Sequence, residues 1–294
     1  SVTTGVQNTI IGALAGDALT DADFNTAVGL NAISSDTKGN YTTALGFSAL
    51  GIQNFTTSTD TYNVAVGAFA GRQVTTGVQN TFIGGLSGDA ITSASSNVAL
   101  GYAALTSDTL GVASVAIGVE ALEAQNFTTA TNSYNVAVGF RAGEAVTTGI
   151  QNTLVGGIAG DALTDADFNT AVGVAALSLD TLGSHSTALG HGTLQNQNFT
   201  TATSAYNTAV GSQAGAAVTT GKENTIVGGL AGDALTVGGN NAVLGYFALG
   251  TDTKGSLSVA IGPSALESQN FTTATNTYNT AVGAAAGAAV TTGT

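Results

Sequence analysis

The segment VTTGVQNTIIGALAGDALT at residues 2–20 decides the fold, because the chain repeats it at a constant spacing. Its copies are VTTGVQNTFIGGLSGDAIT at 74–92, VTTGIQNTLVGGIAGDALT at 146–164 and VTTGKENTIVGGLAGDALT at 218–236. Self-similarity at a fixed period is typical of repeat architectures. We therefore expect one repeat region over 1–294. Its 72-residue units are 2–73, 74–145, 146–217 and 218–289, and 290–294 begins a fifth.

Each unit divides into four shorter segments, which we call coils. The signature Asn-x-apolar-apolar-Gly, with Ser or Thr replacing Asn in the third coil, occurs once per coil, and its glycines follow one another at steps of 17, 17, 21 and 17 residues. These signature glycines are Gly12, Gly29, Gly46, Gly67, Gly84, Gly101, Gly118, Gly139, Gly156, Gly173, Gly190, Gly211, Gly228, Gly245, Gly262 and Gly283. The chain is thus expected to contain sixteen coils.

Two positions relative to the signature glycine accept only small side chains. Four residues before it stands Asn in twelve coils, and a hydroxyl residue in the others: Thr42, Ser114, Ser186 and Ser258. Stacked Asn side chains can hydrogen-bond along a β stack, so we expect an Asn ladder. Three residues after the glycine, fourteen coils carry Ala.

Short runs such as NTAVG, NVAVG and SVAIG are rich in β-branched residues and end at Gly. They predict one strand of about five residues per coil, and a second, weaker strand in the remainder. Frequent Gly and β-branched residues oppose a helical repeat. The predicted fold is all-β, a parallel β-solenoid or β-roll in which each strand pairs with its copies about 4.8 Å above and below.

The strands are apolar on both faces. In SVAIG, Val115 and Ile117 point one way and Ala116 the other, because side chains alternate along a strand. One face fills the coil interior, and the other needs a second layer. We therefore predict that identical chains pack around a common axis as a homotrimer. Since VTTG recurs in the same phase at 2–5 and 290–293, head-to-tail stacking of chains is a further expectation.

Composition excludes several functions. A formal charge of −13 opposes nucleic-acid binding, and no apolar run approaches the roughly 20 residues of a membrane-spanning helix. We predict no catalytic, cofactor-binding or metal-binding residues, hence no enzyme and no membrane insertion. Ser184, His185 and Asp180 do not form a nucleophile-elbow sequence.

Other polar residues have simple structural interpretations. His185 and His191 are expected in surface loops. The repeated aspartates Asp17, Asp89, Asp161 and Asp233 are expected to accept hydrogen bonds from turn backbone rather than to bind calcium. Asp21 and Asp23 recur as Asp165 and Asp167, and suit local calcium binding slightly better. A Thr array for ice binding is disfavoured, since Val replaces Thr in several coils.

The 21-residue step carries QNFTTSTDTYN at 53–63 and near copies in every unit, so a longer loop is expected once per unit. This loop is the candidate recognition or interface ridge. The alternative is that its Phe fills a gap in the core or the subunit interface. Its candidate residues are Asn54, Phe55, Asn126, Phe127, Asn198, Phe199, Asn270 and Phe271.

The segments NSYNVAVGFRAG at 132–143, SVAIGVEAL at 114–122 and NTAVGVAAL at 169–177 resemble the head repeats of YadA-like trimeric autotransporter adhesins. Similar repeats occur in phage tail fibres. The resemblance implies a left-handed, trimeric β-roll displayed outside the cell and used for attachment. We therefore expect a non-catalytic segment of an extracellular or cell-surface fibre or adhesin, which mediates attachment or filament assembly.

Two alternatives stay open. One is a phage tail-fibre shaft, located on the virion. The other, of a different class, is a glycan-binding module that uses the QNFTT loop to hold a surface glycan or host receptor. Substitutions of Phe55 and its copies that abolish sugar binding would favour this second alternative.

Overall fold

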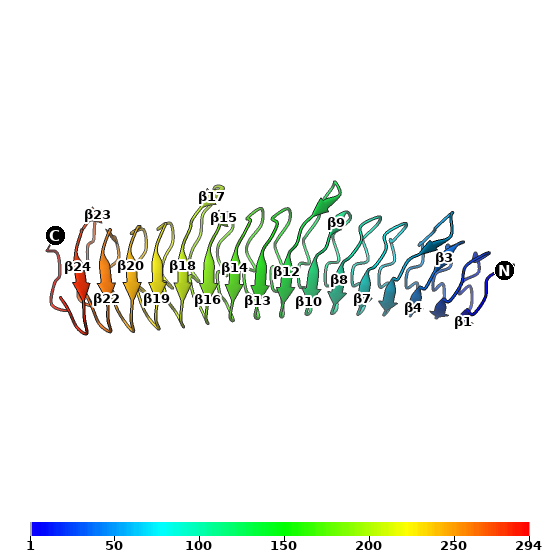
Figure 1. Cartoon of the computed structure of the whole chain (residues 1–294), viewed down its shortest axis with the longest axis horizontal. Coiled ribbons are helices and arrows are strands. Elements are labelled where there is room, and N and C mark those ends of the chain that lie inside the picture. Colours follow the sequence, from blue (N-terminus) through cyan, green and yellow to red (C-terminus); the bar gives the residue numbers. More distant parts are fainter. Residues whose placement is uncertain (1, 294) are drawn as a thin grey trace. The chain divides into compact units, whose positions relative to one another are not determined.

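The computed structural model describes residues 2–293, and no residue among them is helical. Ser1 and Thr294, the outermost residues of the predicted repeat region, lie outside the described residues. The chain is a parallel β-solenoid of about sixteen turns, in which each turn contributes one strand to a sheet (Figure 1). It divides into two compact units, 2–148 and 149–293. No helix in the described part of the chain could cross a membrane.

Each compact unit contributes eight strands of three residues. In the first unit they are, in sheet order, β1 (Thr9–Ile11), β2 (Thr26–Val28), β4 (Thr43–Leu45), β6 (Val64–Val66), β7 (Thr81–Ile83), β8 (Val98–Leu100), β10 (Val115–Ile117) and β12 (Val136–Val138). In the second they are β13 (Thr153–Val155), β14 (Thr170–Val172), β16 (Thr187–Leu189), β18 (Thr208–Val210), β19 (Thr225–Val227), β20 (Ala242–Leu244), β22 (Val259–Ile261) and β24 (Thr280–Val282).

The pairing is parallel and in the register that the signature predicts. Thr9 pairs with Thr26, and Ala44 with Ala65, so equivalent positions of successive coils form columns. The expected strand length of five residues is wrong. A left-handed residue such as Phe24, with φ of 60°, precedes each Asn, and the signature glycine, with φ of 134° at Gly29, ends the strand. Between these two breaks only three residues keep extended pairing.

The expected second strand in every coil is also wrong. Two-residue strands form only in the third and fourth coils of each repeat, at the opposite end of the coil from the main sheet (Figure 1). The pairs are β3 (Gly39–Asn40) with β5 (Thr59–Asp60), β9 (Gly111–Val112) with β11 (Thr131–Asn132), β15 (Gly183–Ser184) with β17 (Thr203–Ser204), and β21 (Gly255–Ser256) with β23 (Thr275–Asn276). Elsewhere side chains accept the backbone N–H, as the Asp23 carboxylate does from Val6 at 2.7 Å.

The middle residue of each strand faces the coil interior, and the flanking residues face outward. Ala116 is fully buried between half-buried Val115 and Ile117, so the predicted alternation is confirmed. Side-chain size is balanced within a coil. The first coil of the second repeat has Phe82 in the middle of its strand and Gly88 later, where a Cβ would lie 2.4 Å from the Phe82 ring. Second and third coils, which have Ala or Val in mid-strand, place a buried Leu or Ile at that later position instead, such as Leu105. Fourth coils have Ala in mid-strand and Gly at the later position, and there side chains of the neighbouring coils fill the space, as Phe82 does beside Gly71.

The Asn column is buried, but its bonding differs from the expected ladder of side chains. The Asn97 Oδ1 accepts the backbone N–H of Ser114 in the next coil at 2.9 Å, and its Nδ2 donates to the carbonyl of Gly111 at 2.8 Å. Each Asn thus joins its coil to the backbone of the next. Direct bonds between Asn side chains add to these contacts, as from Asn224 to Asn207 and from Asn241 to Asn224.

Replacing Asn97 with Ala is expected to lower the free energy of unfolding by about 2 to 3 kcal/mol, because two buried backbone groups lose their partners. Urea denaturation followed by circular dichroism measures the change. The control is Asn54→Ala at an exposed position, with an expected change below about 0.5 kcal/mol. Equal effects of the two substitutions would contradict the role of the buried Asn column.

Candidate functional site

The long loop between the third and fourth strands of each repeat divides its candidate residues into a buried and an exposed set. The rings of Phe55, Phe127, Phe199 and Phe271 are only 5 to 6% exposed. Each neighbouring Asn is exposed: Asn54, Asn126, Asn198 and Asn270. The Phe rings are therefore inaccessible on this loop. In the first repeat its accessible residues are Asn54, the Thr residues that follow the Phe, and also Ser58, Asp60 and Tyr62.

Backbone bonds on both sides hold the Phe in place. The Phe127 N–H donates to the Asp108 carboxylate at 3.2 Å, and its carbonyl accepts the Thr109 hydroxyl at 2.9 Å. The ring packs against Gly111, where a Cβ would lie 2.9 Å from it. Phe127 thus occupies core space beneath the loop. Recognition through this ridge stays a prediction, and it depends on the exposed residues of the loop rather than on the Phe rings.

A buried polar network closes each 21-residue coil, and the sequence reasoning missed it. In the second repeat the Asp108 carboxylate accepts the Gln125 amide at 2.6 Å and the Gly111 N–H at 3.0 Å. Gln125 Nε2 also donates to the Ser114 hydroxyl, and Gln125 Oε1 accepts from Asn135 at 2.9 Å. Burial raises the pKa of Asp108 above its usual 3.8, although these hydrogen bonds oppose the shift.

The same Asp and Gln recur in every repeat, and all are fully buried: Asp36 with Gln53, Asp108 with Gln125, Asp180 with Gln197, and Asp252 with Gln269. The sequence feature that could have revealed this network is the constant separation of 17 residues between the Asp and the Gln. It places the two side chains one coil apart in the same column. This network explains why the third coil carries Ser or Thr in place of Asn, since Gln takes over the bonds to the neighbouring coil.

The third residue of each main strand faces outward, and these residues form an apolar column along the sheet. Leu100 is 41% exposed, Leu244 49%, Ile11 60% and Val282 67%, and the equivalent residues of the other coils are at least half-buried Val, Ile or Leu. The first residues of the main strands form a second outward column, which mixes Thr, Val and Ala. Nothing within either compact unit covers this face. The main strands of each compact unit therefore present a row of apolar side chains that is available to another surface.

Exposed aromatic rings stack in the column before the Asn. In the first repeat Phe24 lies 4.8 Å from Tyr41, and Tyr41 lies 5.3 Å from Tyr62, measured between ring centroids. In the third repeat His185 stacks between Phe168 and Tyr206. His185 therefore takes part in ring packing. This column was not recognised in the sequence, because its members change from coil to coil.

The aspartates have structural partners in the neighbouring coil. Asp21 accepts the Thr4 hydroxyl at 2.7 Å, and Asp167 accepts the Ile150 N–H at 2.8 Å. Asp89 accepts a side-chain bond from Thr106, at 2.5 Å. Asp233 accepts hydrogen bonds from the turn backbone at Asp233 and Ala234, as the sequence suggested.

Three glutamates that the sequence reasoning did not single out gather in the second repeat. Glu120, Glu123 and Glu144 have carboxylate oxygens within 4.8 Å of one another. Arg141 lies among them, 2.6 Å from Glu120 and 3.6 Å from Glu144. Burial raises the pKa of Glu123, and Glu120 and Glu144 raise it further. The arrangement is an acidic surface that is partly neutralised by one Arg.

These features place the chain in the class of parallel β-solenoid repeat proteins. No family model matches it, and no curated protein or solved structure is similar enough to count as a match.

Proposed function

We propose that the chain is a non-catalytic structural segment of an extracellular or cell-surface fibre or adhesin, which assembles with copies of itself and mediates attachment or filament assembly. The assembly is a left-handed homotrimer in this proposal. The observation that carries it is the apolar outer column of each sheet, which includes Leu100 and Leu244. Contiguous exposed apolar residues are typical of surfaces that bind another protein.

Self-association fits this face better than a different partner does. The apolar column recurs once per coil at the spacing of the strands, so a second copy of the chain offers a matching row at the same spacing. The first-column residues are Thr, Val or Ala and allow close approach. A net charge of −13 on each copy disfavours association through other surfaces, so the uncharged sheet face is the favoured contact.

Replacing Leu100 and Leu244 together with Asp is expected to dissociate the assembly into monomers of 28.6 kDa, because charged side chains would be buried in the interface. Both positions are exposed in the single chain, so the fold is retained. Light scattering gives the mass, and circular dichroism checks the fold. Wild-type protein is expected at three times the chain mass.

The matched control is Thr57→Asp on the exposed long loop, which is expected to keep the wild-type mass. A monomeric wild type, or a double variant with an unchanged mass, would refute assembly through this face. Long filaments in negative-stain electron microscopy would add head-to-tail stacking of chains to the proposal.

The phage tail-fibre shaft is the second candidate of the same class, and the same apolar column favours it, since a shaft also needs parallel chains around one axis. The two are separated by immunogold labelling of the producing culture. Label on cell surfaces supports the adhesin, whereas label on virions supports the tail fibre.

A further inference from the structure

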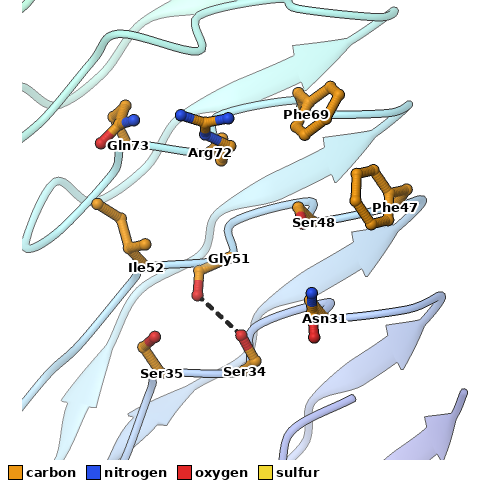
Figure 2. A pocket seen from close by; sticks show the side chains of 10 residues that line it. All are labelled: Asn31, Ser34, Ser35, Phe47, Ser48, Gly51, Ile52, Phe69, Arg72 and Gln73. Carbon is orange, nitrogen blue, oxygen red and sulfur yellow. Dashed lines mark hydrogen bonds between the residues drawn. The ribbon is translucent and has the colours of Figure 1, made fainter. Parts of the chain in front are cut away.

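A hollow of about 420 Å³ lies on the first repeat, on the turns that follow the main strands of its second, third and fourth coils (Figure 2). Its lining combines one cation, two aromatic rings and several small polar side chains. The residues that matter here are Ser34, Ser35, Phe47, Phe69, Arg72 and Gln73. No Asp or Glu lines it, although the chain has 18 acidic residues and only 5 basic ones.

Arg72 provides the charge of the hollow. Its guanidinium lies 5.3 Å from the centroid of the Phe69 ring, and Phe69 meets Phe47 edge to face at 4.9 Å. Among residues 2–293 no carboxylate pairs with Arg72 and no side-chain hydrogen bond uses it. Stacking on Phe69 orients the guanidinium, whose five N–H donors stay available for a carboxylate.

The remaining lining suits a hydroxylated molecule. The Ser34 hydroxyl donates to the Gly51 carbonyl at 3.1 Å, which leaves the Ser34 oxygen as an acceptor (Figure 2). Ser35 and Gln73 contribute a further hydroxyl and an amide. Phe47 is 41% exposed, so its ring can pack against C–H groups. Cation, ring and small polar groups together match a sugar that carries a carboxylate.

The other repeats lack this combination at the equivalent positions. In the second repeat Glu144 replaces Arg72 and Arg141 replaces Phe69, while Glu123 stands in place of Gly51. In the third and fourth repeats Ala216 and Ala288 replace Arg72. This combination of lining residues is therefore particular to the first repeat and does not follow from the repeated fold. The glutamate cluster described above provides an equivalent surface of opposite charge within the same chain.

We propose that the hollow of the first repeat binds a carboxylate-bearing sugar residue. Arg72 pairs with the carboxylate, Phe47 and Phe69 pack against the C–H face, and Ser35 and Gln73 bond the hydroxyl groups. The inference deepens the proposed attachment function by naming its ligand class, and it rests on that function for its biological meaning.

The test uses the full chain and three probes in low salt: glucuronate, glucose as the uncharged analogue, and acetate as a carboxylate without a sugar. Saturation-transfer NMR measures binding, because it suits weak ligands of large particles. Glucuronate is expected to bind with a dissociation constant of about 1 mM, typical of weak small-ligand contacts. Glucose and acetate are each expected to bind at least about tenfold more weakly.

Arg72→Ala is expected to weaken glucuronate binding at least about tenfold, and Phe47→Ala to weaken it several-fold. The matched control Arg141→Ala removes the other Arg of the chain and is expected to leave binding unchanged. Binding that survives Arg72→Ala would overturn the proposal. Equal binding of glucose would overturn the role of the carboxylate, and equal binding of acetate would reduce the hollow to a simple anion site.

The mass of each sample, measured by light scattering, separates this proposal from that of assembly. Arg72→Ala protein with the wild-type mass and lost glucuronate binding supports the hollow as the binding site. If wild-type protein is monomeric but still binds glucuronate through Arg72, the homotrimer fails and the sugar site stands. If the trimer forms and glucuronate does not bind, the homotrimer stands and the sugar site fails.

Discussion

Replacing Gly156 with Ala is expected to lower the free energy of unfolding by about 4 kcal/mol, whereas Gly157→Ala at the next residue is expected to change it by less than about 0.5 kcal/mol. A Cβ on Gly156 would lie 2.5 Å from the carbonyl oxygen of Gly173 in the following coil. Its φ is also +135°, a conformation that costs any other residue. A Cβ on Gly157 meets nothing within 4 Å.

A third variant separates the two causes. Gly283 has the same backbone conformation, with φ of +130°, but the nearest atom to its Cβ is 3.8 Å away. Gly283→Ala therefore reports backbone strain without the collision, and we expect a loss of about 1 to 2 kcal/mol. Thermal unfolding followed by circular dichroism ranks the three variants. If Gly156→Ala and Gly157→Ala unfold at the same temperature, close stacking of the coil backbones is not what requires glycine.

Replacing Gln125 with Leu is expected to lower the free energy of unfolding by about 3 to 4 kcal/mol at pH 7, because the buried Asp108 carboxylate loses its 2.6 Å amide donor. The Gln125 hydrogen bond lowers the pKa of Asp108, so its loss raises a pKa that burial has already raised. With the folded pKa above the usual 3.8, the charged form is penalised only in the folded state.

The sign of the pH dependence follows from this shift. The penalty is absent below pH 3.8, where Asp108 is protonated in both states, grows as the pH rises, and is complete above the folded pKa. Urea denaturation of wild type and variant at pH 3.5 and 7 measures the difference. Asp108→Asn in the Gln125→Leu background is the control, since it removes the charge and should recover about half of the loss. A deficit that is constant with pH would contradict this account.

Much of the fold could be predicted from the sequence. The 17, 17, 21 and 17 residue steps place equivalent residues one coil apart, and parallel pairing of Thr9 with Thr26 confirms that placement. The burial of Ala116 between Val115 and Ile117 was also predictable, because alternation along a strand is a local property. Strand lengths were not predictable, since they depend on where left-handed residues such as Phe24 interrupt the pairing.

The candidate sites were less predictable. The sequence marked the QNFTT loop by its recurrence, but recurrence alone does not distinguish a core ring from a ligand contact, and the Phe127 side chain lies in the core. Asp108 and Gln125 each looked like an ordinary polar residue. Their partnership became visible only when the coil brought them within 2.6 Å of each other.

The sequence by its own periodicity determines the parallel solenoid, its columns and its glycine positions, because in a stack of equal coils the spacing along the chain becomes adjacency in space. Only the tertiary structure decides which side chains converge within those columns. Arg72 and Phe47 lie 25 residues apart and belong to different coils, yet they line one hollow. Such convergence depends on the direction of each side chain as it leaves the turn, and the repeat period does not specify that direction.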